Sequence, residues 1–195
     1  MVILIDNGHG YNTRGKHSPD KLVHEWKEVR IIADKLYEEL DTIGYTVIKL
    51  VPEDTDISLK ERARRANAYC KTYGAKNCVL ISLHLNAAGA DGKWHEASGV
   101  SVHVSHNASS NSKKLAKLIW DRAIENGLKG NRYVPSEGYI AQNLAICRDT
   151  NCPAVLVENL FMDNKSDAAI ILSEEGKNKI VKFLINAIIK YCALQ

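Results

Sequence analysis

The chain has 195 residues, of which 45% are hydrophobic and 25% are charged. This length suits one large core and is too short for two ordinary domains, and the composition excludes long disordered stretches. We therefore expect a single domain that spans residues 1–195. The formal net charge is only +3, with Lys and Arg spread along the chain, so no nucleic-acid partner is predicted.

The sequence gives no sign of a membrane segment or of an export signal. No stretch approaches the ~20 apolar residues that a membrane span needs, so we expect no membrane insertion. The first residues, Met1 to Asp6, contain no basic region, and their apolar run is too short for a signal peptide. We therefore expect synthesis in the cytoplasm, unless a leader has been removed.

Cysteine usage indicates thiols rather than a disulfide framework. The five cysteines are an odd number and form no Cys-x-x-Cys pattern, which argues against a structural zinc knuckle as well. We interpret them as reduced and mostly packed, although the spacing of Cys147 and Cys152 would allow a small loop to close under oxidation.

Short runs of β-branched residues alternate with helical patterns, which is typical of an α/β domain. We predict a central, mostly parallel or mixed sheet of five to six strands, flanked by helices. The strand candidates are Val2–Asp6, Thr46–Leu50, Cys78–Ser82, Gly99–Val104, Leu144–Arg148 and Ala154–Glu158.

Four helices are predicted between and after these strands. Apolar residues recur at helical spacing over Glu25–Ile43, a capping-box pattern opens a helix over residues 58–73, and a third helix covers residues 112–126. The last helix should cover the sheet with an apolar stripe of Ile180, Val181, Leu184, Ile185 and Ile188. Residues 87–98 and 126–139 are expected to be long loops that border a groove.

Two histidines follow directly after predicted strands. His9 stands between two glycines after the first strand, and His84 follows Cys78–Ser82. Strand ends are where α/β proteins place their sites, so both imidazoles are candidate ligands of one ion. The alternatives are a turn residue capped by its neighbours for His9 and a satisfied core histidine for His84.

Helix geometry selects Glu25 over His24 as a third ligand. At about 100° per residue, Glu25 falls on the buried stripe of its helix, whereas His24 should face solvent. A buried carboxylate needs a partner, and a metal ion would supply one; Arg62 is the alternative partner. Two imidazoles and one carboxylate are a common ligand set for catalytic zinc with an open fourth position.

Glu158 ends the apolar run that begins at Ala154. A carboxylate at the end of a buried strand is either paired structurally or able to act as a base toward water. The residues themselves leave both interpretations open.

The motifs resemble, in order along the chain, those of the N-acetylmuramoyl-L-alanine amidase type 3 family. The resemblance rests on Ile5-Asp-Asn-Gly-His-Gly10, on Glu25 with Ala33 and Leu36, on Leu59, Arg62, Ala66 and Asn67, on Ser82-Leu-His-Leu-Asn-Ala87, on Gly99 to Val102, and on Pro153 to Glu158 with Asn164 and Asp167. The chain departs from the family at Asn7, where Pro is usual, and at Asn159-Leu160-Phe161, where Gly-Phe-Leu is typical.

The resemblance implies a zinc-dependent hydrolase of peptidoglycan. It implies that His9, Glu25 and His84 hold Zn2+ and that Glu158 is the catalytic residue, acting as general base and then general acid with a zinc-activated water. The bond cut would join N-acetylmuramic acid to L-alanine. We expect a single catalytic domain without a separate wall-binding domain, acting as a monomer.

Three further residues are candidate substrate contacts or supporting residues. Arg62 is expected on the inner face of its helix, where it would brace Glu25 or Glu158; Asn86 lies in the second histidine motif; and Arg148 is expected near a strand end. His103 is interpreted as structural.

Two other functions remain open at this point. One is a zinc peptidase that acts on stem peptides, and the other is a non-hydrolytic wall-binding module. An enzyme of this kind would reach the wall either as a phage lysin after release or as a trimmed secreted autolysin.

Overall fold

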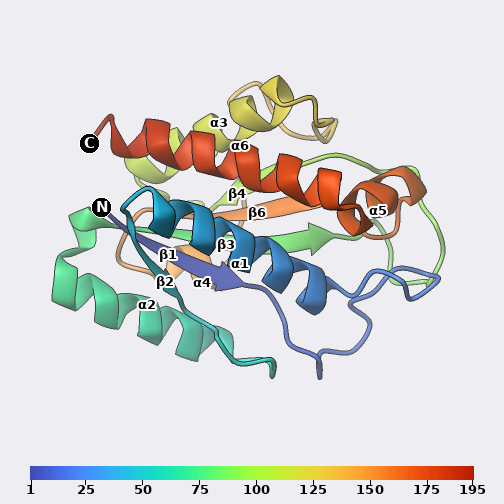
Figure 1. The fold of residues 1–195 in the computed structure, drawn as a ribbon, viewed down its shortest axis with the longest axis horizontal. Coiled ribbons are helices and arrows are strands. Elements are labelled where there is room, and N and C mark those ends of the chain that lie inside the picture. Colours follow the sequence, from blue (N-terminus) through green and yellow to red (C-terminus); the bar gives the residue numbers. More distant parts are fainter.

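The computed structural model describes residues 1–195 and contains one six-stranded sheet in the order β2-β1-β3-β6-β4-β5 (Figure 1). The four neighbours β2, β1, β3 and β6 run parallel, β4 runs antiparallel to β6, and β5 is parallel to β4. The strands are β1 (Val2–Asn7), β2 (Thr46–Lys49), β3 (Cys78–Asn86), β4 (Ser101–Val104), β5 (Ile140–Ala141) and β6 (Ala154–Phe161). The predicted mixed, mostly parallel α/β sheet is confirmed.

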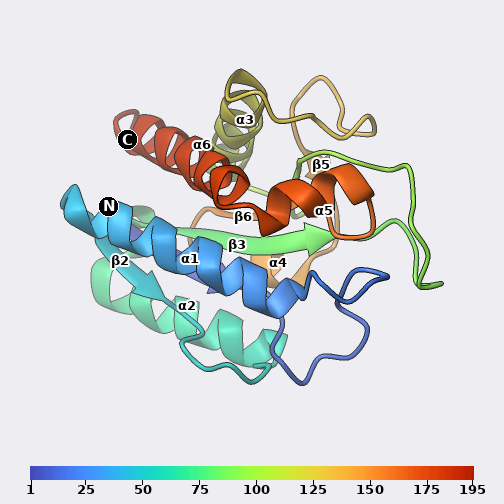
Figure 2. The same cartoon turned by 45° about the vertical axis from the view of Figure 1, so that its right-hand side comes forward.

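Helices cover both faces of this sheet (Figures 1 and 2). In Figure 1, α6 and α2 lie on opposite sides of the strands. The helices are α1 (Glu25–Thr42), α2 (Leu59–Tyr73), α3 (Ser110–Glu125), α4 (Ala145–Arg148), α5 (Lys165–Leu172) and α6 (Glu174–Cys192), and a short 3-10 turn spans Ala75–Asn77.

The alternation of side chains along the strands produces two hydrophobic cores. Ile3 and Ile5 of β1 face the side of α1, α3 and α6, in a cluster of 33 buried residues, whereas Val2 and Leu4 face the side of α2 and α4, in a cluster of 13. Every second residue of a strand points to the same face, and both faces are covered. The central strands therefore read as continuous apolar runs.

Most predicted elements are confirmed, with three corrections. The segment Leu144–Arg148 is not a strand, because residues 145–148 form helix α4; a short apolar run is compatible with either structure. The two-residue strand β5 and helix α5 were not predicted. At the start of α2, the Ser58 side chain accepts a hydrogen bond from the amide of Glu61, but the Glu61 carboxylate binds arginines instead of closing the capping box.

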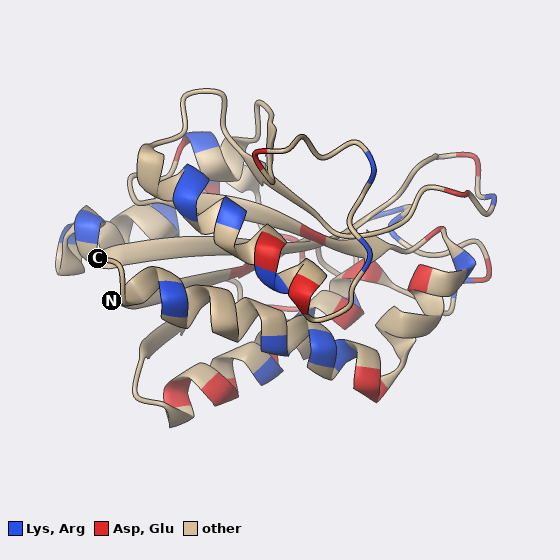
Figure 3. Ribbon diagram, turned by 90° about the horizontal axis from the view of Figure 1, so that it is seen from above, with Lys and Arg blue, Asp and Glu red and all other residues tan.

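The cysteines and the charged residues are arranged as the sequence predicted. All five cysteines are free thiols and four of them are buried, which confirms the prediction of packed thiols. Figure 3 shows Lys and Arg interleaved with Asp and Glu along the helices and loops. None of the helices is both long and apolar enough to cross a membrane.

The carboxyl ends of β1, β3 and β6 meet at one edge of the sheet, which is where ligands of open α/β sheets bind. The loop of residues 87–98 leaves β3 at this edge. Asp163, just after β6, accepts hydrogen bonds from the amides of Ala88 and Gly89, and Asn164 donates to the carbonyl of His95. The segment after β6 therefore holds this loop at the rim.

Candidate metal centre

The sharp turn after β1 requires its two glycines because neighbouring groups approach the backbone closely. A Cβ atom at Gly8 would lie 2.3 Å from Cε1 of His84, and one at Gly10 would lie 2.0 Å from the amide nitrogen of Asp56. His9, between them, adopts a left-handed backbone with φ of 58°, which is uncommon for a residue other than glycine. The turn thus seats the imidazole of His9 beside that of His84.

Two arginines hold this strained turn in place. Arg30 of α1 and Arg62 of α2 both donate to the carbonyl oxygen of His9, at 3.1 and 3.4 Å. Gly8 donates to the carbonyl of Leu83 on the neighbouring strand at 2.9 Å. Strained backbone persists where the surroundings over-determine it, and the two guanidinium groups supply that constraint from opposite faces of the sheet.

Glu25, His9 and His84 converge at the sheet edge from three separate elements. His84 Nδ1 lies 3.0 Å from Glu25 Oε1, and His9 Nε2 lies 3.4 Å from Glu25 Oε2. One ligand-type atom of each of the three residues lies within 4.8 Å of the other two. The helix phase predicted from the sequence is confirmed, since Glu25 is only 1% exposed.

The protonation of this group is set by burial and by mutual contact. Burial lowers the pKa of His9 to about 4, so its ring is neutral near pH 7. Burial alone would raise the pKa of Glu25, but its hydrogen bond with His84 and the neighbouring cationic groups outweigh burial and lower it. The same hydrogen bond raises the pKa of His84 against the opposing effect of burial. Glu25 is therefore an ionised carboxylate between two imidazoles.

Glu158 lies next to this group across the sheet. It pairs in register with His84 between β6 and β3, and its Oε2 atom is buried without a hydrogen-bond partner. Burial raises the pKa of Glu158 to about 7, with His84 opposing that shift. A carboxyl group with this pKa can accept and release a proton near neutral pH.

The backbone around Glu158 is irregular. The pairing of β3 with β6 shifts between His84 and Asn86, and Leu160 adopts a positive φ of 78°. Asn159, at the position where the sequence departs from the typical Gly-Phe-Leu, is buried and donates to the carbonyl of His84 at 3.2 Å. The departure therefore supplies a hydrogen bond that helps fix the second histidine.

A cavity of about 550 Å³ is lined by His9, His84 and Glu158 and extends over the face covered by α2 and α4. Leu59, Leu144 and Leu156 belong to its apolar walls. The cavity thus joins a polar centre to a more apolar groove, an arrangement typical of ligand sites.

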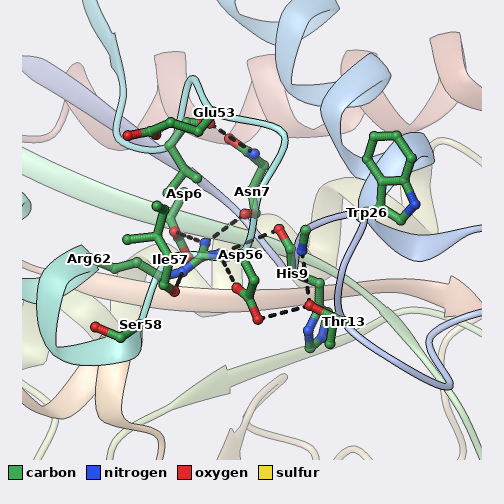
Figure 4. Close-up of polar contacts among 12 residues, drawn as sticks. Asp6, Asn7, His9, Thr13, Trp26, Glu53, Asp56, Ile57, Ser58 and Arg62 are labelled. Carbon is green, nitrogen blue, oxygen red and sulfur yellow. Dashed lines mark hydrogen bonds and ion pairs between the residues drawn. The ribbon is translucent and has the colours of Figure 1, made fainter.

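Arg62 does not brace Glu25 or Glu158, and that part of its expected role is corrected. Its guanidinium donates instead to Asp6 at 2.6 Å, to Asp56 at 3.0 Å and to the carbonyls of Asn7 and Ile57, both at 2.7 Å (Figure 4). Asp6 also accepts a hydrogen bond from Ser82. The strand β1 places the Asp6 carboxylate within reach of α2, so Arg62 satisfies that buried charge rather than Glu25.

The structure places the remaining candidate residues, Asn86, Arg148 and His103, in three different surroundings. Asn86 ends β3, and its side chain accepts from the amide of Ala87. Arg148 is in α4 rather than a strand, where it binds Asp149 and Asn143 and lines a different cavity. His103 is buried and shares a hydrogen bond with Ser101.

Sequence reasoning missed two cationic residues at the centre. Arg30 supports His9 through a backbone carbonyl, and Lys16 lies 4.0 Å from Glu25 Oε2. Lys16 belongs to an irregular loop without periodicity, and Arg30 acts on a turn whose positive φ the sequence does not display. The glycines on both sides of His9 were the one available signal of a strained turn.

The donor set is suited to a cation. Glu25 Oε2 is buried and accepts no hydrogen bond, although buried polar atoms are nearly always paired. The two imidazoles and the ionised carboxylate of Glu25 could together hold a metal ion. Nitrogen ligands of this kind favour a borderline metal ion over a hard cation such as magnesium.

Fold and site together define an α/β protein with a group of two histidines and one glutamate, at the carboxyl ends of its parallel strands, that could hold a metal ion. The model of the N-acetylmuramoyl-L-alanine amidase family Amidase_3 matches residues 3–190, and the chain belongs to that family.

Two curated relatives match nearly the whole chain. The endolysin of Bacillus phage SPP1 is 29% identical over 183 residues, which are 93% of this chain and 62% of the relative. The probable cell wall amidase LytH of Staphylococcus aureus is 26% identical over 188 residues, which are 96% of this chain and 57% of the relative. The chain thus spans about three-fifths of the length of these relatives.

Solved structures share the fold over the full length of the chain. The crystal structure of N-acetylmuramoyl-L-alanine amidase from Clostridium difficile 630 superposes with a TM-score of 0.85 at 28% identity, over 98% of this chain and 96% of that one. The catalytic domain of CwlV from Bacillus (Paenibacillus) polymyxa var. colistinus, at 24% identity, has the same fold with a TM-score of 0.81, over 100% and 99% of the two chains.

Proposed function

We propose that residues 1–195 form the catalytic domain of a zinc-dependent N-acetylmuramoyl-L-alanine amidase. The enzyme hydrolyses the amide bond between the lactyl group of N-acetylmuramic acid and the L-alanine of the stem peptide in peptidoglycan. One observation carries the proposal: His9 and His84 lie against the buried carboxylate of Glu25, whose Oε2 accepts no hydrogen bond, and Glu158 stands beside them on the adjacent strand.

His9, Glu25 and His84 would hold the zinc ion. Zinc, when bound, supplies a Lewis acid that polarises a carbonyl group and makes water a better nucleophile. The chain contributes the rest of the chemistry. Glu158 takes a proton from the attacking water and then delivers it to the departing amine of L-alanine, because its pKa of about 7 suits both transfers.

Other residues position these groups without contacting the reacting bond. Arg30 and Arg62 fix the carbonyl of His9, and Asn159 fixes the carbonyl of His84. The apolar walls of the cavity form a groove that would receive the stem peptide. The relative from phage SPP1 is named an endolysin, and we propose that this chain also acts on the bacterial cell wall.

Mass spectrometry of purified muropeptides incubated with the zinc-loaded protein tests this function. The wild type is expected to release a stem peptide that begins with L-alanine. Glu158→Gln should slow the reaction by about 10²–10⁴-fold and keep its zinc, whereas Glu39→Gln, the same change on the exposed surface of α1, should react normally.

Two outcomes would contradict the proposal. A new amino terminus elsewhere in the peptide would mark a peptidase. Zinc-loaded wild type that binds muropeptides without cleaving them would mark a wall-binding module.

A further inference from the structure

Two cationic side chains line the cavity, and they differ in how their charge is used. Arg62 is 2% exposed and donates to two carboxylates and three backbone carbonyls. Lys16 has a side chain that is 40% exposed, makes no hydrogen bond, and has Glu25 Oε2 as its ion-pair partner at 4.0 Å. Lys16 is therefore the cation of this cavity that is available to a ligand.

The backbone of Lys16 is fixed although its side chain is free. Its carbonyl accepts a 3.0 Å hydrogen bond from the amide of Glu25, the first residue of α1. The next residues continue this pairing, since His17 and His24 form a bridge and Ser18 donates to the carbonyl of Val23. The backbone thus holds Lys16 at the wall of the cavity, with its ammonium group beside Glu25.

Metal binding would change the surroundings of this lysine. A cation held by Glu25 would neutralise that carboxylate and repel the ammonium group, because like charges a few ångströms apart disfavour each other. Lys16 would then lose its ion-pair partner. A flexible lysine at a cavity mouth adapts to an anion whose position is not fixed by the protein, which suits a carboxylate carried by a substrate.

We propose that Lys16 binds a carboxylate of the stem peptide close to the scissile amide, so that the enzyme prefers muropeptides with a free carboxylate on the residue after L-alanine. This inference rests on the proposed amidase function. The rest of the groove offers no other free positive charge: its walls are apolar at Ile57, Leu59, Leu144, Ala145 and Ile146, and the carboxylates of Asp6 and Asp56 are bound by Arg62. A carboxylate that enters beside the zinc site therefore has Lys16 as its counter-ion.

Two muropeptides that differ only at this group test the inference. One carries a free α-carboxylate on the residue after L-alanine, and the other carries a carboxamide there. The wild type should favour the acid in kcat/KM by about tenfold. Lys16→Met should remove this preference by raising KM for the acid while leaving the amide substrate nearly unchanged. Lys16→Arg should keep the preference, and Lys27→Met, on the exposed side of α1, should behave as the wild type.

A binding measurement gives a second readout that does not depend on turnover. In zinc-loaded Glu158→Gln protein, adding Lys16→Met should weaken calorimetric binding of the acid muropeptide by about tenfold and leave binding of the amide muropeptide and the zinc content unchanged. If wild type cleaves neither substrate, the amidase proposal fails, yet the binding ratio still tests Lys16.

Three results would overturn the role of Lys16. The first is an acid-to-amide ratio that Lys16→Met leaves intact. The second is an equal fall in kcat for both substrates, which would assign Lys16 to stabilising the reacting carbonyl. The third is loss of zinc from the Lys16→Met protein, which would assign it to supporting Glu25.

Discussion

Two neighbouring buried ionic groups, one around Arg62 and one around Glu25, are built in opposite ways. Around Arg62, five hydrogen bonds use the whole guanidinium group, and Asp6 has partners on both oxygens. Around Glu25, one carboxylate oxygen is buried without a hydrogen bond, and the second histidine contact is longer, at 3.4 Å.

The difference distinguishes a structural network from a binding site. A fully satisfied network fixes the backbone and gains nothing from a ligand. An ionised carboxylate left short of partners is held there by the rest of the fold and is stabilised when a cation arrives. Arg62 links the two groups, because it donates to the carbonyl of His9 while its charge is neutralised by Asp6 and Asp56.

The largest expected effect on stability comes from breaking the satisfied group. Arg62→Met leaves the buried carboxylate of Asp6 without its ion-pair partner, so the free energy of unfolding should fall by about 3–5 kcal/mol. Urea denaturation of the metal-free protein measures this loss. Arg64→Met, on the exposed side of the same helix, is the matched control and should change stability little. Equal stability of the two variants would refute the structural role of Arg62.

The same measurement on Glu25 should give a smaller effect. Glu25→Gln removes a charge whose pKa the contacts with His84 and the neighbouring cations lower, but whose Oε2 has no hydrogen bond, so the metal-free protein should lose no more than about 1–2 kcal/mol of stability. Glu25→Gln should no longer bind zinc, and metal analysis of the dialysed protein measures this loss. A large destabilisation of metal-free protein would instead mark Glu25 as a structural residue.

A smaller effect is expected from crowding the metal-binding group. The Cβ atom in Gly8→Ala would displace the ring of His84, which it would approach to 2.3 Å. Since supporting residues around a metal site change affinity by about 10–100-fold, zinc affinity should fall within this range. Thermal unfolding in chelator reports whether the fold is retained. Unchanged zinc affinity would mean that His84 is not a ligand.

The last expected effect is a pH dependence of stability without metal. The pKa of Glu158 is raised to about 7 in the folded state, whereas in the unfolded chain it is near 4.5. Between these values the folded protein binds the proton and the unfolded chain does not, so wild-type stability falls as pH rises toward 7. Denaturation curves measured in chelator from pH 4.5 to 8 give the free energy of unfolding at each pH. This free energy should fall more steeply with pH for the wild type than for Glu158→Gln. Parallel profiles of the two proteins would contradict the burial of an ionisable Glu158.

The sequence could predict that His9, Glu25 and His84 lie close together because each lies on a regular element or directly after one. His9 and His84 follow buried strands, and helix periodicity placed Glu25 on the covered side of α1. Strand ends and helix phase are local properties, so they can be inferred without knowing how the elements pack.

The partner of Arg62 could not be predicted in this way. Asp6 and Glu25 both compete for a buried cation, and only the position of α2 over β1 decides between them. The same limit explains why Leu144–Arg148 was predicted as a strand and forms a helix instead. Its few apolar residues fit a strand and a helical turn equally well. Lys16 and Arg30 act through loop and backbone geometry that no residue pattern encodes.

The most direct test of the account is a crystal structure of the protein grown with zinc, with anomalous diffraction data measured at the zinc absorption edge. The account predicts one zinc ion bonded to His9, Glu25 and His84 at about 2.0–2.2 Å, with the carboxylate of Glu158 facing the open side of the ion. A map without zinc at these residues, in which Glu25 still pairs with His84, would contradict it.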